Sequence, residues 1–149
     1  MLNRKQFEML LGIHCVLMLT VALGCGGKPQ ETYPVSGVVQ WKDGKPATEL
    51  AGATVELQVI EGVLLRVSPR GEVQADGKFT LRTYEPKDGA PAGKYRAMIT
   101  PVLLADPGAA VALSSLDSRF QSFTTTPLQV TVAPQPNEIV LPVQRAKGR

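Results

Sequence analysis

The sequence predicts an all-β sandwich of about seven short strands, preceded by an N-terminal signal helix. Three observations support this fold class. Apolar and polar residues alternate with the period of a strand through much of residues 33–144. Gly (14 residues) and Pro (12 residues) recur at short intervals, which favours turns over long helices. The length of 149 residues, of which 44% are apolar, fits one domain with a single core.

Residues 1–24 have the three parts of an export signal. A short basic start contains Arg4 and Lys5, an uncharged apolar run follows over residues 9–23, and small residues end the segment. As a helix, this run would measure roughly 22 Å, which is shorter than the roughly 30 Å hydrocarbon core of a bilayer. We therefore expect a signal segment and not a permanent membrane span.

The signal ends in Ala22-Leu23-Gly24-Cys25, which resembles the lipobox of bacterial lipoproteins. In that family a small residue precedes a cysteine that is lipidated and becomes the new N-terminus, and the position of Ala22 usually holds Leu. The resemblance implies lipidation at Cys25, where two or more acyl chains would hold the protein to a bilayer. We expect residues 25–32 to carry the lipid and form a flexible tether. An ordinary secretory signal or an uncleaved anchor stays open.

The first two strands are expected to be separated by a tight turn at 43–44 and a connection over residues 45–52. Residues 33–41 (YPVSGVVQW) have the strand period and precede Asp43-Gly44, a dipeptide suited to hairpin turns because Gly adopts positive φ at little cost. Residues 53–60 (ATVELQVI) have one polar and one apolar face, as in a half-buried strand. The apolar face consists of Ala53, Val55, Leu57 and Val59.

The middle of the sequence predicts a further strand and a hairpin. Residues 63–67 extend the sheet until Pro69, which has no N–H to donate to a ladder. Residues 72–75 and 78–84 are expected to form a hairpin around the Asp-Gly turn at 76–77.

The last part of the sequence predicts three strands. Residues 94–100 (KYRAMIT) alternate with Tyr95, Ala97 and Ile99 on one face. Residues 102–119 are expected to be a long connection with room for one helical turn. Residues 128–132 and 138–143 are expected to pair as a closing hairpin. Residues 145–149 form a basic tail.

Four short motifs in the exported part carry a family resemblance. They are V-x-G-x-V at 35–39, D-G-x-P at 43–46, G-A-x-V at 52–55 and D-G-x-F-x-L at 76–81. On these motifs the chain resembles the carboxypeptidase regulatory-like, transthyretin-like domains of small planctomycete-type secreted lipoproteins. The resemblance implies an immunoglobulin-like (transthyretin- or prealbumin-like) sandwich of seven strands over residues 33–144, with an accessory or surface role. It carries over no catalytic residue.

The positions of cysteine and histidine exclude several chemistries. Cys15 and His14 lie inside the signal, and Cys25 is the expected lipidation site. The mature domain therefore lacks the side chains for a Cys/His zinc site, a Ser-His-Asp triad or a thiol nucleophile. Its acids are spread singly, with no spacing typical of an acid/base pair or a calcium loop. We expect no metal, no cofactor and no enzymatic activity; a site built from distant acids stays the open alternative.

The candidate binding residues are aromatic. Trp41 is suited to stack on a sugar ring, although a tryptophan at a strand end more often caps the core. Phe120 and Phe123 either rim a ligand groove or fasten the long connection onto the sandwich.

The basic residues are scattered, and the net charge is +3, so we expect no nucleic-acid partner. Four arginines are candidates for a basic strip that faces anionic polymers or lipid headgroups, although solvent-exposed strand faces commonly carry such residues. They are Arg66, Arg70, Arg82 and Arg96.

The sequence thus predicts a non-catalytic, lipid-anchored cell-envelope sandwich with a structural or accessory binding role, at the outer membrane or the periplasmic face. The alternative is a carbohydrate- or peptide-binding module at the cell surface that uses, for a peptide, an exposed strand edge. The expected partners are the membrane, through the anchor, and an envelope polysaccharide or protein.

Overall fold

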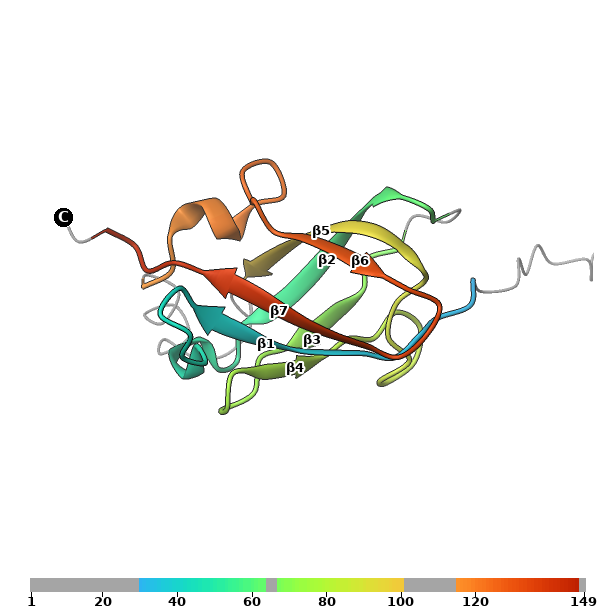
Figure 1. Cartoon of the computed structure of the whole chain (residues 1–149), viewed down its shortest axis with the longest axis horizontal. Coiled ribbons are helices and arrows are strands. Elements are labelled where there is room, and N and C mark those ends of the chain that lie inside the picture. The colour runs from blue at the N-terminus through green and yellow to red at the C-terminus, as the bar shows by residue number, and fades with distance from the viewer. Residues whose placement is uncertain (1–29, 64–66, 101–114, 148–149) are drawn as a thin grey trace, which may run out of the picture.

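A computed structural model describes residues 30–63, 67–100 and 115–147 of the chain (Figure 1). The expected signal at 1–24 and the lipidation site Cys25 lie outside the described residues. So do residues 64–66 and most of the expected connection at 102–119. None of the helices in the described part is long and apolar enough to cross a membrane.

Seven strands among the described residues form two sheets, which confirms the predicted all-β class. The three-stranded sheet has the order β4-β1-β7, and the four-stranded sheet has the order β3-β2-β5-β6. Two 3-10 helices, η2 (Thr48–Leu50) and η3 (Ser118–Gln121), lie in the connections. The strands are β1 (Val35–Trp41), β2 (Thr54–Glu61), β3 (Arg70–Glu72), β4 (Lys78–Thr80), β5 (Gly93–Thr100), β6 (Gln129–Val132) and β7 (Asn137–Val143).

One apolar core takes side chains from both sheets. The strand period predicted for residues 53–60 and 94–100 is confirmed, because alternate side chains of β2 and β5 are buried. Val59, near the end of β2, is only half-buried. The three-stranded sheet contributes Val35, Val39, Trp41, Phe79, Leu141 and Val143, and the four-stranded sheet contributes Val55, Leu57, Tyr95, Ala97, Ile99, Val130 and Val132.

β7 is an edge strand that pairs in parallel with β1 along its whole length. The N–H of Asn137 donates to the carbonyl of Pro34 at 2.9 Å, so the odd-numbered residues of β7 direct their backbone groups toward β1. Pro142 is even-numbered and therefore faces the free edge, where a missing N–H costs the ladder nothing.

The expected closing hairpin of residues 128–132 and 138–143 is wrong, because its strands are divided between the two sheets. The expected hairpin around residues 76–77 forms in part: the N–H of Gln74 donates to the carbonyl of Lys78 at 2.7 Å and Arg70 forms an antiparallel bridge with Arg82, although the two named strands have their main partners in different sheets. β6 pairs with β5, whereas β7 pairs with β1. β3 pairs with β2, whereas β4 pairs with β1. Between β6 and β7, Pro134 and Pro136 lack the N–H groups that a hairpin ladder needs. The Asp-Gly turns are confirmed, since Gly44 and Gly77 both have positive φ (88° and 80°).

The expected strand at 63–67 does not form at Val63 or Val67, its two described residues. Gly62 has a φ of 89°, and this left-handed conformation changes the direction of the backbone directly after β2. The sheet resumes only at Arg70, the first residue of β3.

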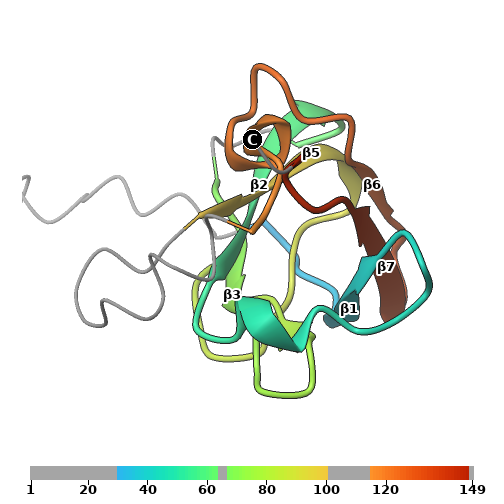
Figure 2. The ribbon, with the colours of Figure 1, turned by 90° about the vertical axis from the view of Figure 1, so that its left-hand side faces the viewer.

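The ordered chain continues past the expected start of the tail at residue 145. Arg145 forms a bridge with Leu116, and the N–H of Ala146 donates to the carbonyl of Ser115 at 2.7 Å. These contacts place the segment that contains η3 beside the end of β7 (Figure 2). Leu116 and Phe120, each 2% exposed, extend the core there.

Candidate functional site

Two polar side chains face the solvent side by side on the outer surface of the four-stranded sheet. Gln58 of β2 and Arg96 of β5 are direct antiparallel partners, so their side chains lie on the same face. On its other side Arg96 pairs with Gln129 of β6. Met98, two residues further along β5, shares this face and is half-buried. The Arg96 cation is thus flanked by the amides of Gln58 and Gln129 and lies beside the thioether of Met98.

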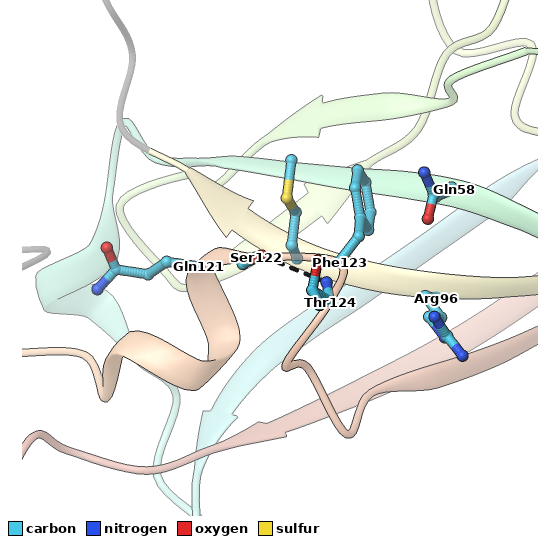
Figure 3. A pocket seen from close by; sticks show the side chains of 7 residues that line it. Gln58, Arg96, Gln121, Ser122, Phe123 and Thr124 are labelled. Atoms are coloured by element: carbon cyan, nitrogen blue, oxygen red, sulfur yellow. Dashed lines mark hydrogen bonds between the residues drawn. The ribbon is translucent and has the colours of Figure 1, made fainter.

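The loop after η3 is held in place by bonds to Ser122. The carbonyl of Ser122 accepts the N–H groups of Thr125 (3.2 Å) and Thr126 (2.9 Å). Its hydroxyl oxygen accepts the N–H of Thr124 at 3.3 Å (Figure 3). These bonds hold the backbone around Phe123 in a turn.

Phe120 and Phe123 have different surroundings although they are three residues apart. Phe120 is 2% exposed and belongs to the core. Phe123 is half-buried and lines a groove over the outer face of β2 and β5. Phe120 thus packs in the core, whereas Phe123 lines the groove.

This outer-face groove has a volume of about 540 Å³. Gln58, Arg96 and Met98 form its floor, and the loop at 121–124 forms one wall (Figure 3). No ion pair is found for Arg96 in the part of the chain that the structure describes. A cation, amides and hydroxyls beside one aromatic ring suit a hydroxyl-rich ligand that has an apolar face.

Trp41 does not join this groove and lies on β1 of the other sheet. It is 2% exposed, and its Nε1 donates to Oε2 of Glu49 at 2.9 Å. The guanidinium of Arg145 lies 4.1 Å from the centroid of the Trp41 ring and donates to Oε1 of Glu49 at 2.9 Å. A sugar could stack on this indole only after Arg145 had moved away.

The pKa of Glu49 is lowered to about 2 by this arrangement. The hydrogen bond from Trp41 is the main cause, and a backbone N–H and the Arg145 guanidinium add to it. Glu49 is therefore a carboxylate at neutral pH and ties Arg145 to the indole.

The sequence did not single out Gln58, Met98, Gln121 or Ser122. The only sequence feature that marked Gln58 was the alternation in residues 53–60, which placed it on the polar face. Nothing in the spacing indicated that β2 pairs with β5 in the register that brings Gln58 against Arg96. Across the described ranges, no three His, Cys, Asp or Glu side chains are grouped so that they could hold a metal ion.

No protein-family model and no curated protein matches the chain. Two solved structures match the chain at low similarity. Catechol 1,2-dioxygenase from Pseudomonas arvilla is 13% identical, with a TM-score of 0.42 over 83% of this chain. A 9R-lipoxygenase from Cyanothece is 14% identical, with a TM-score of 0.38 over 95% of this chain. The chain spans 55% and 24% of the lengths of those two proteins.

The expectation that this chain is not an enzyme is contradicted by these matches, since both similar structures are enzymes. At this degree of likeness they assign neither a reaction nor a substrate to the chain.

Proposed function

We propose that this chain is a lipid-anchored cell-envelope module that binds carbohydrate in the outer-face groove. The observation that carries the proposal is the convergence of Phe123 with the Gln58–Arg96 pair around a space of about 540 Å³. An aromatic ring binds the apolar face of a sugar, while amides and a guanidinium bind its hydroxyls. The volume of the groove lies within the range that is typical of small-molecule binding sites in proteins.

The family and the anchor are part of the same proposal. The V-x-G-x-V motif falls on β1, and the D-G-x-F-x-L motif runs from the turn before β4 to the residue after it, which supports an immunoglobulin-like, transthyretin-like module. Lipidation at Cys25 is supported by the lipobox-like sequence that ends at this residue. Metabolic labelling with a fatty-acid analogue tests the anchor: we expect label on the chain and none on the Cys25→Ser variant.

A peptide ligand that adds to a strand edge has less support. β3, β4 and β6 are edge strands of only three or four residues. β7 is longer, but Pro142 removes one donor from its free edge. Peptide binding is therefore treated as an outcome of the test.

The test is a binding screen of the full chain, purified in non-ionic detergent, against envelope oligosaccharides and peptides. We expect saturable binding of an oligosaccharide that weakens about tenfold or more in Phe123→Ala, because loss of an aromatic contact at a binding site typically costs this much. Tyr84→Ala is the matched control, since it removes an aromatic ring that is 43% exposed and lies outside the groove. Binding of peptides alone, or equal losses in both variants, would refute the proposal.

A further inference from the structure

A second groove, here called the β3–β4 groove, lies where these two strands meet, and it shares no lining residue with the outer-face groove. Its volume is about 430 Å³. Three cations line it, namely Arg70, Arg82 and Lys87, together with the polar residues Glu72 and Thr80. All five side chains are exposed.

Arg70 and Arg82 are directly opposite one another. The N–H of Arg70 donates to the carbonyl of Arg82 at 3.0 Å, and the N–H of Arg82 donates to the carbonyl of Arg70 at 2.9 Å. Strand residues that exchange both bonds carry their side chains side by side on one face. Like charges at such positions destabilise a sheet, so the fold itself gains nothing from this pair.

The two acids near this pair, Glu56 and Glu72, form no ion pair with it among the described residues. Glu56 of β2 lies across from Arg70, but its Oε1 accepts a 2.6 Å hydrogen bond from the hydroxyl of Ser68. Glu72 lies two residues from Arg70 on β3 and therefore on the same face. Among the residues with described positions, neither Arg70 nor Arg82 forms an ion pair. Two guanidinium groups remain available to a ligand.

Lys87 is held at the same groove in a conformation that lysine disfavours. Its φ is 66°, and no other non-glycine residue in the described part of the chain has a positive φ. The carboxylate of Asp88 fixes this loop by accepting the N–H groups of Thr83 (2.6 Å), Tyr84 (2.9 Å) and Glu85 (3.1 Å). A glycine would adopt this conformation without the penalty. Unfavourable backbone conformations are concentrated at functional sites.

We propose that the β3–β4 groove binds the phosphate group of a phosphate ester. Two guanidinium groups and an ammonium group are the donors that proteins use for phosphate oxygens. The groove is larger than a phosphate ion, which leaves room for the alcohol part of the ester, and Glu72 and Thr80 offer partners for its hydroxyls. A soluble sugar or glycerol phosphate and a phospholipid headgroup share this chemistry. The proposal does not depend on carbohydrate binding in the outer-face groove.

The experiment is calorimetric titration of the full chain, in non-ionic detergent at low salt, with glycerol phosphate and with glycerol. We expect saturable binding of glycerol phosphate and none of glycerol. Arg82→Gln and Lys87→Gln should each weaken binding about tenfold, because each removes a charge-assisted contact. Lys45→Gln is the matched control: it removes an exposed lysine that lines neither groove, and it should leave the affinity unchanged.

Absence of saturable binding, or an equal loss in Lys45→Gln, would overturn the proposal. Circular dichroism and urea unfolding check that Arg82→Gln is still folded. Removal of a like-charge neighbour should not reduce its stability. A second titration, with the chain in phosphatidylglycerol nanodiscs, distinguishes a phospholipid headgroup from a soluble phosphate ester as the ligand. Headgroups that occupy the groove would suppress binding of glycerol phosphate, whereas an unchanged affinity would assign the groove to a soluble ester.

Discussion

The guanidinium of Arg145 covers the ring of Trp41 at 4.1 Å and is tied to it through Glu49, which accepts hydrogen bonds from both residues. Arg145 follows the last strand, and Trp41 ends the first, so the contact joins the two ends of the parallel β1–β7 pair. This end of the core is therefore closed by one charged side chain from a segment that the sequence placed in a tail.

Arg145→Ala should destabilise the fold by about 1–2 kcal/mol, because it removes a cation–π contact and a hydrogen-bonded ion pair together. Urea unfolding of the full chain measures this loss. Arg96→Ala is the control, since Arg96 is exposed without an ion pair among the described residues and its removal should change stability by less than about 0.5 kcal/mol. Equal effects of the two substitutions would show that the contact with Trp41 contributes nothing.

The stability of the fold should fall in acid partly through Glu49. Its pKa is about 2 in the folded chain, against 4.5 for an ordinary glutamate, so the unfolded chain binds its proton first as the pH falls. The contribution of the ionised carboxylate is full above the unfolded pKa and is lost as the pH falls toward about 2. The unfolding free energies of the wild type and Glu49→Gln should therefore converge between about pH 6 and about pH 2. A constant difference over this range would count against the assigned role.

Gly89→Ala should be far more damaging than Gly52→Ala, although the two glycines have nearly the same φ (83° and 84°). A Cβ at Gly89 would overlap the carbonyl of Tyr33, whereas a Cβ at Gly52 would meet nothing within 4 Å. We expect a loss of about 1 kcal/mol for Gly52→Ala, from the backbone conformation alone, and about 3 kcal/mol or more for Gly89→Ala. Thermal unfolding of both variants tests the close approach of Gly89 to Tyr33.

Lys87→Gly should stabilise the fold by about 0.5–1 kcal/mol, because glycine adopts the left-handed conformation without a side-chain clash. Lys87→Ala removes the same charge but keeps the Cβ, so it should give no such gain. Urea unfolding compares the two variants. Equal stabilities would mean that the conformation of Lys87 is not strained.

Most of the strands could be predicted from the sequence because their pattern is local. Alternating burial in β2 and β5 follows directly from the alternation of residue types. The pairing of strands could not be predicted in the same way. β6 and β7 follow one another closely, yet Asn137 pairs with Val35 of β1 and not with β6. Which sheet a strand joins depends on contacts between distant segments, which the alternation does not encode.

The candidate site shows the same limit. Phe123 could be named from its residue type, but its separation from Phe120 depends on how η3 packs against β5. Trp41 was named for the same reason, and its ring proved to be covered by Arg145. Gln58 became a candidate only once its partner Arg96 was known.

The most direct test of the outer-face groove uses Met98, the one methionine after residue 24 in the sequence. A Met98→Leu variant identifies its methyl signal among those of Met1, Met9 and Met18 in the full chain, and NMR follows this signal while an envelope oligosaccharide is added. We predict a saturable shift of the Met98 signal in the wild type that is lost in Phe123→Ala. An unmoved Met98 signal while the oligosaccharide binds, or an undiminished shift in Phe123→Ala, would contradict carbohydrate binding at this groove.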